Sequence, residues 1–194
     1  AAGITDAITA RLATLHGLGV ISRQSAMQYK KTEKTARQIA DELQVDYILE
    51  GTVQRERPSD PNSRVRIIPQ LIKASNDTHV WAPPQPYDNE MSEVFRVQSD
   101  LAEQVAQALH VTLIERERRA LWSRPTENME AYDYYLRGKE YWHRGYAKQN
   151  WTVAIQMFER AVELDPKFAL AYAHLSRCHA AMYWDRNDPT AERL

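Results

Sequence analysis

Apolar residues at helical spacing open the sequence and return after each extended segment. The first apolar stripe predicts a helix over about residues 4–16, which two glycines end. A short apolar run at residues 20–21 predicts a strand after this turn. A second stripe at residues 39–43 predicts another helix.

β-branched and aromatic residues are concentrated in residues 46–53 and again in residues 65–72. The turn-forming segment 57–63 separates them, so we predict an antiparallel hairpin with a long loop. Pro69 lies inside the second run and has no backbone N–H. We therefore expect that strand to lie at a sheet edge or to carry a bulge there. Residues 77–81 predict a few more extended positions.

A long amphipathic stripe over residues 91–113 predicts a helix that covers one face of the sheet. The order helix, strand, helix, hairpin, helix predicts a small α/β domain with a mixed sheet over residues 1–124. Pro125 and the helix-capping residue type at Asn128 mark its end. Residues 125–194 are then a second, all-α part, so the fold class is α+β.

The second part places small and large residues where two antiparallel helices would touch. The positions are Tyr134, Gly138 and Tyr141 in one helix, Ala154, Phe158, Ala161 and Pro166 in the next, and Tyr172, Leu175 and Ser176 where the pattern restarts. Residues 128–184 thereby resemble the tetratricopeptide repeat family, with one complete and one partial repeat. The turn at residues 143–150 is longer than is usual in that family.

The resemblance implies that the first helix of each repeat lines a concave groove. Counted from Gly138 and Ser176, the residues directed toward that groove are Tyr135, Lys139, Trp142, Ala173 and Arg177. Aromatic anchors beside cations suit an extended peptide with an acidic group. The alternative is that Tyr135 or Trp142 packs under the long turn. Because such repeats bury their apolar faces against neighbours, we expect the array to continue past Leu194.

The first part also matches a known family. The matching segments are residues 3–8, 20–23, 38–53, 65–67, 70–72 and 79–81. They resemble the TolB amino-terminal-like domain over most of residues 1–124, and in bacteria this domain is commonly followed by tetratricopeptide repeats. The family begins with an apolar strand that this chain lacks, which implies a gap in the sheet. Pro69 and the insertion at residues 83–86 also depart from the family pattern.

The two resemblances together imply a place behind a signalling domain, which in these families is a class III adenylate cyclase, a winged-helix DNA-binding domain of the CadC type, or a protein kinase. None of their motifs is in this chain. We therefore expect a non-catalytic regulatory and protein-interaction region of a multidomain bacterial signalling protein, with an adenylate cyclase as the first choice. The alternatives are an enzyme that uses the α/β domain and an assembly module that forms a homodimer through an exposed sheet edge.

Composition narrows the classes of partner. Lys and Arg number 25 against 26 Asp and Glu, so nucleic acid and anionic membrane surfaces are poor partners for this segment. Alternating charges at residues 115–119 predict a solvated helix face. No stretch approaches the roughly 18 apolar residues of a membrane span. The single Cys178 allows no internal disulfide and leaves the compartment open, cytoplasmic or periplasmic.

Candidate chemistry is sparse. His174 and Cys178 are four residues apart on one predicted helix and could share a metal, but two ligands do not make a site, and such a cysteine is usually core. Four carboxylates could pair as acid and base, although a cap or a solvated face explains each: Asp6, Asp41, Glu42 and Glu50. No nucleophile elbow or phosphate loop occurs. We predict no catalytic residue, no cofactor and no metal site.

Overall fold

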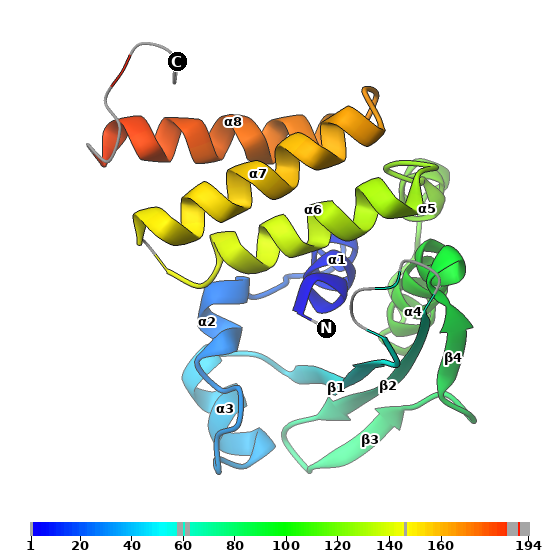
Figure 1. Ribbon diagram of the computed structural model, residues 1–194. Helices are drawn as coiled ribbons and strands as arrows, with labels where there is room; N and C mark the ends of the chain where they lie inside the picture. The colour runs from blue at the N-terminus through cyan, green and yellow to red at the C-terminus, as the bar shows by residue number, and fades with distance from the viewer. Residues whose placement is uncertain (1, 58–59, 61–62, 146, 186–189, 191–194) are drawn as a thin grey trace. The chain divides into compact units, whose positions relative to one another are not determined.

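The chain divides into two compact units, Gly3–Ser123 and Arg124–Leu194. The computed structural model, drawn in Figure 1, describes residues 2–57, 60, 63–145, 147–185 and 190. The first unit combines a four-stranded antiparallel sheet with helices, and the described residues of the second unit form helices. The predicted α+β class is confirmed.

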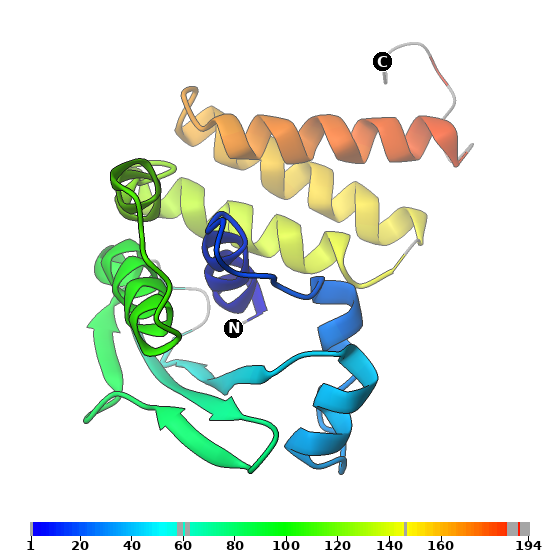
Figure 2. The ribbon, with the colours of Figure 1, turned by 180° about the vertical axis from the view of Figure 1, so that it is seen from behind.

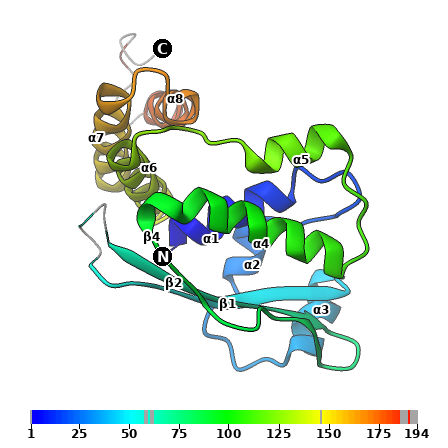
Figure 3. The same cartoon turned by 90° about the vertical axis from the view of Figure 1, so that its right-hand side faces the viewer.

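The first unit alternates short helices with a small sheet. Its elements are α1 (Ala2–Leu12), α2 (Arg23–Met27), α3 (Ala36–Leu43), β1 (Tyr47–Arg55), β2 (Arg64–Lys73), β3 (Thr78–Trp81), β4 (Tyr87–Glu90), the 3-10 turn η1 (Met91–Glu93), α4 (Val94–Ala108) and α5 (Glu115–Trp122). Figure 3 shows α1 and α4 on the same side of the sheet. The apolar stripe of α4 is buried there, as the periodicity predicted.

The predicted hairpin is confirmed. β1 and β2 pair antiparallel from Tyr47↔Lys73 to Arg55↔Val65, although most of the loop predicted at residues 57–63 lies outside the described residues. The prediction of a mixed sheet is wrong, because every pairing between described strands is antiparallel. Residues 20–21 are not the predicted strand. They lead directly into Ser22, whose side chain accepts a hydrogen bond from the Ser25 amide and caps α2.

Pro69 lies in the middle strand of the sheet, so the edge-strand alternative is wrong, and the register of β2 shifts between Leu71 and Ile72, not at Pro69. β2 pairs with β1 on one side and with both β3 and β4 on the other. On this second side the pairing with β4 ends at Ile67 and the pairing with β3 begins at Leu71. Pro69 therefore faces the break between two partner strands.

The direction of the backbone hydrogen bonds explains why the sheet tolerates this proline. The Ala74 amide donates to the Asp46 carbonyl, next to β1, and the Met91 amide donates to the Ser63 carbonyl, next to β4. Even-numbered residues of β2 thus bond to β1, and odd-numbered residues point to the other side. Pro69 is odd-numbered, so its missing N–H would have pointed into the break, where β2 needs no donor.

The second unit consists of α6 (Met129–Trp142), α7 (Lys148–Leu164) and α8 (Ala169–Trp184), which Figure 2 shows from behind. Asn128 joins two helix ends, since its Oδ1 accepts from the Ala131 amide at 3.0 Å and its Nδ2 donates to the Leu164 carbonyl at 3.0 Å. α7 ends just before Pro166, which cannot continue a helix. The turn predicted at residues 143–150 is too long, because α7 already begins at Lys148; its residue 146 lies outside the described residues.

Candidate functional site

A glycine lets α6 approach α7 closely. A Cβ atom built on Gly138 would lie 2.6 Å from the Phe158 ring, which is fully buried. Ala154 and Ala161 are also fully buried on α7. The small residues of the sequence pattern therefore lie where large ones would prevent the contact, and Phe158 fills the space beside them.

Tyr135 belongs to the core that these helices share. It is only 5% exposed. Its ring centroid lies 5.0 Å from that of Phe168, 5.9 Å from that of Phe158 and 5.4 Å from that of His174. The aromatic contacts connect α6, α7 and α8. The structure gives Tyr135 a packing role, and its contact with a partner stays a prediction.

The two predicted groove cations each lie over an aromatic ring. Lys139 Nζ is 5.7 Å from the Tyr135 ring centroid, and the Arg177 guanidinium carbon is 5.5 Å from the Trp142 ring centroid. Lys139 is only 8% exposed, whereas Arg177 is exposed on α8. The first contact lies within α6, and the second joins α8 to α6. Ala173 is exposed on α8, and its place in a binding surface stays a prediction.

His174 adds a half-buried ring to this group, and the repeat spacing did not identify it as a groove residue. Burial and then the positive charges of Lys139, Arg177 and His143 lower the pKa of His174 to about 4. His174 is therefore uncharged at neutral pH. Lys139 and Arg177 thus place two positive charges near His174, which favours an anionic group on a partner. We call Tyr135, Lys139, Trp142, Ala173 and Arg177 together the α6–α8 surface.

Cys178, which is a candidate metal ligand together with His174, is fully buried. Burial raises the pKa of the Cys178 thiol to about 12, so it stays protonated at neutral pH and is a poor metal ligand. Across the described residues, no three His, Cys, Asp or Glu side chains are grouped as ligands of one ion. Nothing in this region therefore favours the metal alternative.

The four carboxylates weighed as acid and base lie on three elements, α1, α3 and β1, and only Asp41 and Glu42 share one, as sequence neighbours on α3. Asp6 on α1 pairs with Arg23, and Glu50 on β1 accepts a hydrogen bond from Gln70 on β2. Asp41 is exposed on α3. No pair of them has the geometry of a shared acid–base site.

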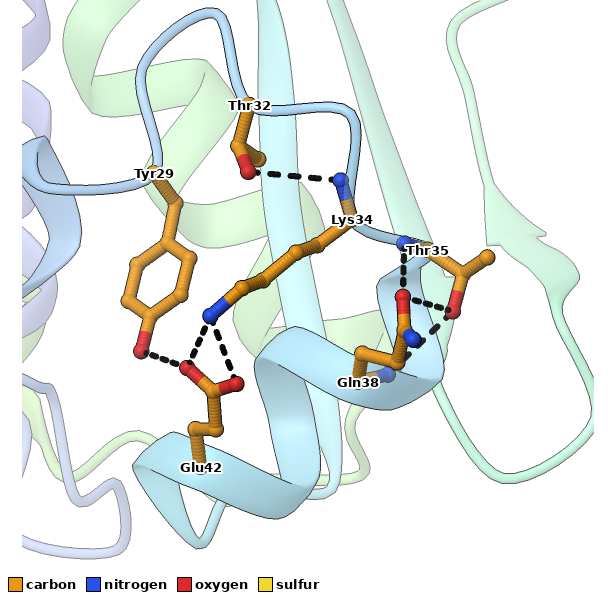
Figure 4. A network of polar contacts seen from close by, with 6 residues as sticks. All are labelled: Tyr29, Thr32, Lys34, Thr35, Gln38 and Glu42. Atoms are coloured by element: carbon orange, nitrogen blue, oxygen red, sulfur yellow. Dashed lines mark hydrogen bonds and ion pairs between the residues drawn. The ribbon is translucent and has the colours of Figure 1, made fainter.

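Glu42, the fourth of these carboxylates, belongs to the polar network that Figure 4 shows between α2 and α3. It accepts hydrogen bonds from Tyr29 Oη at 2.7 Å and from Lys34 Nζ at 2.6 Å. The hydrogen bond from Lys34 lowers the pKa of Glu42, and the bond to Glu42 raises the pKa of both donors. Each pKa moves away from neutrality, which is the opposite of what acid–base catalysis requires. The network supports the loop before α3.

Glu117 is a buried carboxylate where the charge pattern predicted a solvated helix face. It is 6% exposed. Its oxygens accept from the His16 amide at 2.8 Å and the Ile114 amide at 3.0 Å, and His16 Nδ1 lies at 2.8 Å. The backbone bond from His16, followed by its side chain, lowers the pKa of Glu117 to about 2. Glu117 thus ties the start of α5 to the segment after α1, which alternating charge could not reveal.

Comparison with known proteins relates this chain to a segment of a longer protein. No protein-family model matches this sequence. The chain is 35% identical over 174 residues, 90% of its length, to a protein named "Putative adenylate cyclase 3" from Rhizobium meliloti (strain 1021). The match spans 28% of that relative's length. None of the described helices is long and apolar enough to cross a membrane. The chain is therefore similar to one segment of a much longer protein.

Proposed function

We propose that this chain is a non-catalytic, protein-binding regulatory region of a larger bacterial signalling protein whose signalling domain is an adenylate cyclase. The 35% identity to a segment of a protein named as an adenylate cyclase supports this proposal. Because the matched segment is 28% of that protein, most of the relative lies outside it. A winged-helix regulator or a protein kinase remains the alternative that the family resemblance leaves open.

The second unit is proposed to be a tetratricopeptide repeat region. The close approach of Gly138 to Phe158, and the buried Ala154 and Ala161, support this identity because the family packs its helices through small residues. The first unit is proposed to be a TolB amino-terminal-like domain. The hairpin of β1 and β2 supports it, since its strands contain residues 47–53 of the family-like segment 38–53 and the family-like segments 65–67 and 70–72.

The partner is proposed to be an extended peptide with an acidic group, bound at the α6–α8 surface. The observation that carries this step is the pairing of Lys139 with Tyr135 and of Arg177 with Trp142. Exposed Arg177 would bind a carboxylate, and the ring of Trp142 would pack against an apolar side chain next to it. Buried Lys139 would act through its charge, because it sits too deep to follow a ligand.

Fluorescence anisotropy with a labelled peptide of alternating glutamate and leucine tests this binding. We expect binding that weakens as salt is added, and weaker binding of the glutamine counterpart of the peptide. Arg177→Ala should weaken binding about tenfold, since it removes a charged hydrogen-bond donor. Arg160→Ala is the matched control, because Arg160 is exposed on α7 and pairs with Glu163. Equal binding of both peptides, or an unchanged affinity of Arg177→Ala, would refute the acidic ligand.

The signalling domain is tested separately. The gene that encodes this chain should also encode an adenylate cyclase domain, and the full-length protein should convert ATP to cyclic AMP. A full-length gene with a different signalling domain, or with none, would refute the cyclase assignment. Peptide binding by the helical unit would remain untouched by that result.

Self-association is a second candidate function because β1 is an edge strand. β1 is nine residues long and pairs only with β2 among the described strands. Tyr47 is 38% exposed, and Gly51 is also exposed. An exposed edge of this length can pair with the same edge of a second copy. We expect a dimer by light scattering, and Val53→Pro should abolish it, since the new residue could not donate a hydrogen bond at the free edge. A monomer at all concentrations would exclude this role.

A further inference from the structure

A hollow in the first unit lies between α4 and the connection from β3 to β4. Its volume is about 470 Å³, which is within the size range of small-ligand sites. The lining residues are Trp81, Pro83, Pro84, Gln85, Tyr87, Asp100 and Gln104. The hollow therefore involves the proline-rich insertion at residues 83–86, which the expected functions of this chain do not explain.

The wall of the hollow is stiff. Pro83 and Pro84 have a fixed φ angle and no backbone N–H, so this part of the wall has few conformations to lose when a ligand binds. Trp81 at the end of β3 and Tyr87 at the start of β4 hold the two ends of the connection in the sheet. Both aromatic side chains are half-buried and line the hollow. A bound group would meet preformed aromatic surface.

Asp100 is the negatively charged residue that lines the hollow. Tyr87 Oη donates a hydrogen bond to Asp100 Oδ2 at 2.7 Å. Burial and then the bond to Asp100 raise the pKa of Tyr87, so its hydroxyl stays protonated and keeps donating. Among the described residues, no Lys, Arg or His nitrogen lies within 4.0 Å of the Asp100 carboxylate. A half-buried carboxylate with one tyrosine donor thus faces the hollow without a cation.

We propose that this hollow binds the side chain of an arginine from a partner protein, with the guanidinium on Asp100 and between Trp81 and Tyr87. A guanidinium is planar and weakly hydrated, so it stacks on aromatic rings while it donates to a carboxylate. The Gln85 and Gln104 amides offer hydrogen bonds to the backbone of the same partner. An anionic ligand would be repelled by Asp100. This site is distinct from the α6–α8 surface, which carries the opposite charge.

NMR titration of the isotope-labelled chain with N-acetyl-arginine amide tests the proposal. We expect shifts of the Trp81 indole N–H, smaller shifts with the lysine analogue, and none with the neutral citrulline analogue. Equal response to arginine and citrulline would overturn the role of charge. Equal response to arginine and lysine would overturn the assignment to arginine, and no response at Trp81 would overturn the site.

Matched variants locate the charge. Asp100→Asn keeps an oxygen that can accept from Tyr87, so the fold should persist while arginine binding weakens about tenfold or more. Asp88→Asn removes the same charge from β4, where Asp88 pairs with exposed Arg64 outside the hollow. It should bind arginine as the unchanged chain does. Equal losses in the two variants would reduce the effect to net charge and overturn the proposal. Trp81→Ala should also weaken binding, and circular dichroism would verify that each variant is folded.

Discussion

Replacement of Gly138 by alanine is the sharpest test of the helix packing in the second unit. The new Cβ would lie 2.6 Å from one Phe158 ring atom and 2.8 Å from two others. Carbon atoms in contact are normally about 3.5–4.0 Å apart, so this approach is about 1 Å too short. Phe158 is fully buried, and its ring packs against Tyr135 and His174. The ring therefore cannot move aside without disturbing other aromatic contacts.

Two opposing effects determine how much Gly138→Ala changes the free energy of unfolding. Alanine favours a helix over glycine by about 1 kcal/mol. Overpacking of a core costs about 1–3 kcal/mol, and the upper half of that range applies where the clashing ring is enclosed. We expect a net loss of about 1–2 kcal/mol in the free energy of unfolding of the second unit.

The assay needs a signal from the second unit alone, because a chain of two units need not unfold in a single step. Cys178 supplies it, since it is the only cysteine, lies in α8 and is fully buried. Its reaction with a thiol reagent across a urea series therefore reports the opening of that unit. Glu140→Ala, on the exposed side of α6, is the control and should change stability by no more than about 0.5 kcal/mol.

A double-mutant cycle decides whether the ring is the cause. In a Phe158→Leu background the aromatic edge is gone, so Gly138→Ala should cost at least about 0.5 kcal/mol less than in the parent chain. An unchanged cost would show that Phe158 is not what excludes the methyl group. Stabilisation of the parent by about 1 kcal/mol, the helix term alone, would refute the close packing of α6 on α7.

Three further substitutions test other parts of the structure. Gly51→Ala should destabilise the first unit by about 1–3 kcal/mol, since the new Cβ would lie 2.3 Å from the Ile68 carbonyl oxygen. Urea denaturation measures this loss, and unchanged stability would contradict the register of β1 on β2. Asn128→Ala should cost the second unit about 0.5–2 kcal/mol in the thiol assay, because two helix ends lose a partner; a neutral result would exclude that capping role. The pKa of Glu117 is about 2 in the folded chain and about 4.3 in the unfolded chain, so the ionised carboxylate stabilises the fold above pH 4.3, and this stabilisation is lost as the pH falls toward 2. In acid titrations, Glu117→Gln should make the stability of the first unit depend less steeply on pH over this range. Parallel curves for the two chains would contradict the role of Glu117.

Local pattern was sufficient where local chemistry and tertiary pairing agree. The β-branched runs at residues 46–53 and 65–72 form the expected hairpin, and the apolar stripe of α4 faces the core. The sequence pattern did not predict the structure where pairing with a neighbouring strand determines it. β4 contains Tyr87, Asp88, Asn89 and Glu90, a composition poor in strand formers, yet it is a strand because β2 offers an unpaired edge from Arg64 to Ile67. Residues 20–21 have strand composition but pair with no described strand.

The candidate site shows the same division. Repeat spacing selected Lys139, Trp142 and Arg177, and the structure places two of them in one cation–π pair. Spacing could not predict that Tyr135 and Lys139 would be buried, because Phe168 and α8, which cover this region, are remote in sequence. It also could not assign an uncharged state to His174, which depends on burial and on surrounding cations.

The chain is nearly neutral overall, but it has two local surfaces of opposite charge. The formal net charge of −1 argues against a polyelectrolyte partner, but it averages over a cationic α6–α8 surface and an anionic hollow beside Asp100. In both places the charge lies next to an aromatic side chain, Trp142 in one and Trp81 in the other. An aromatic surface excludes water and strengthens a nearby charge pair. The few charges at each place are therefore enough to select the sign of the ligand, so the two proposed sites would recruit chemically different partners without conferring general affinity for polyanions.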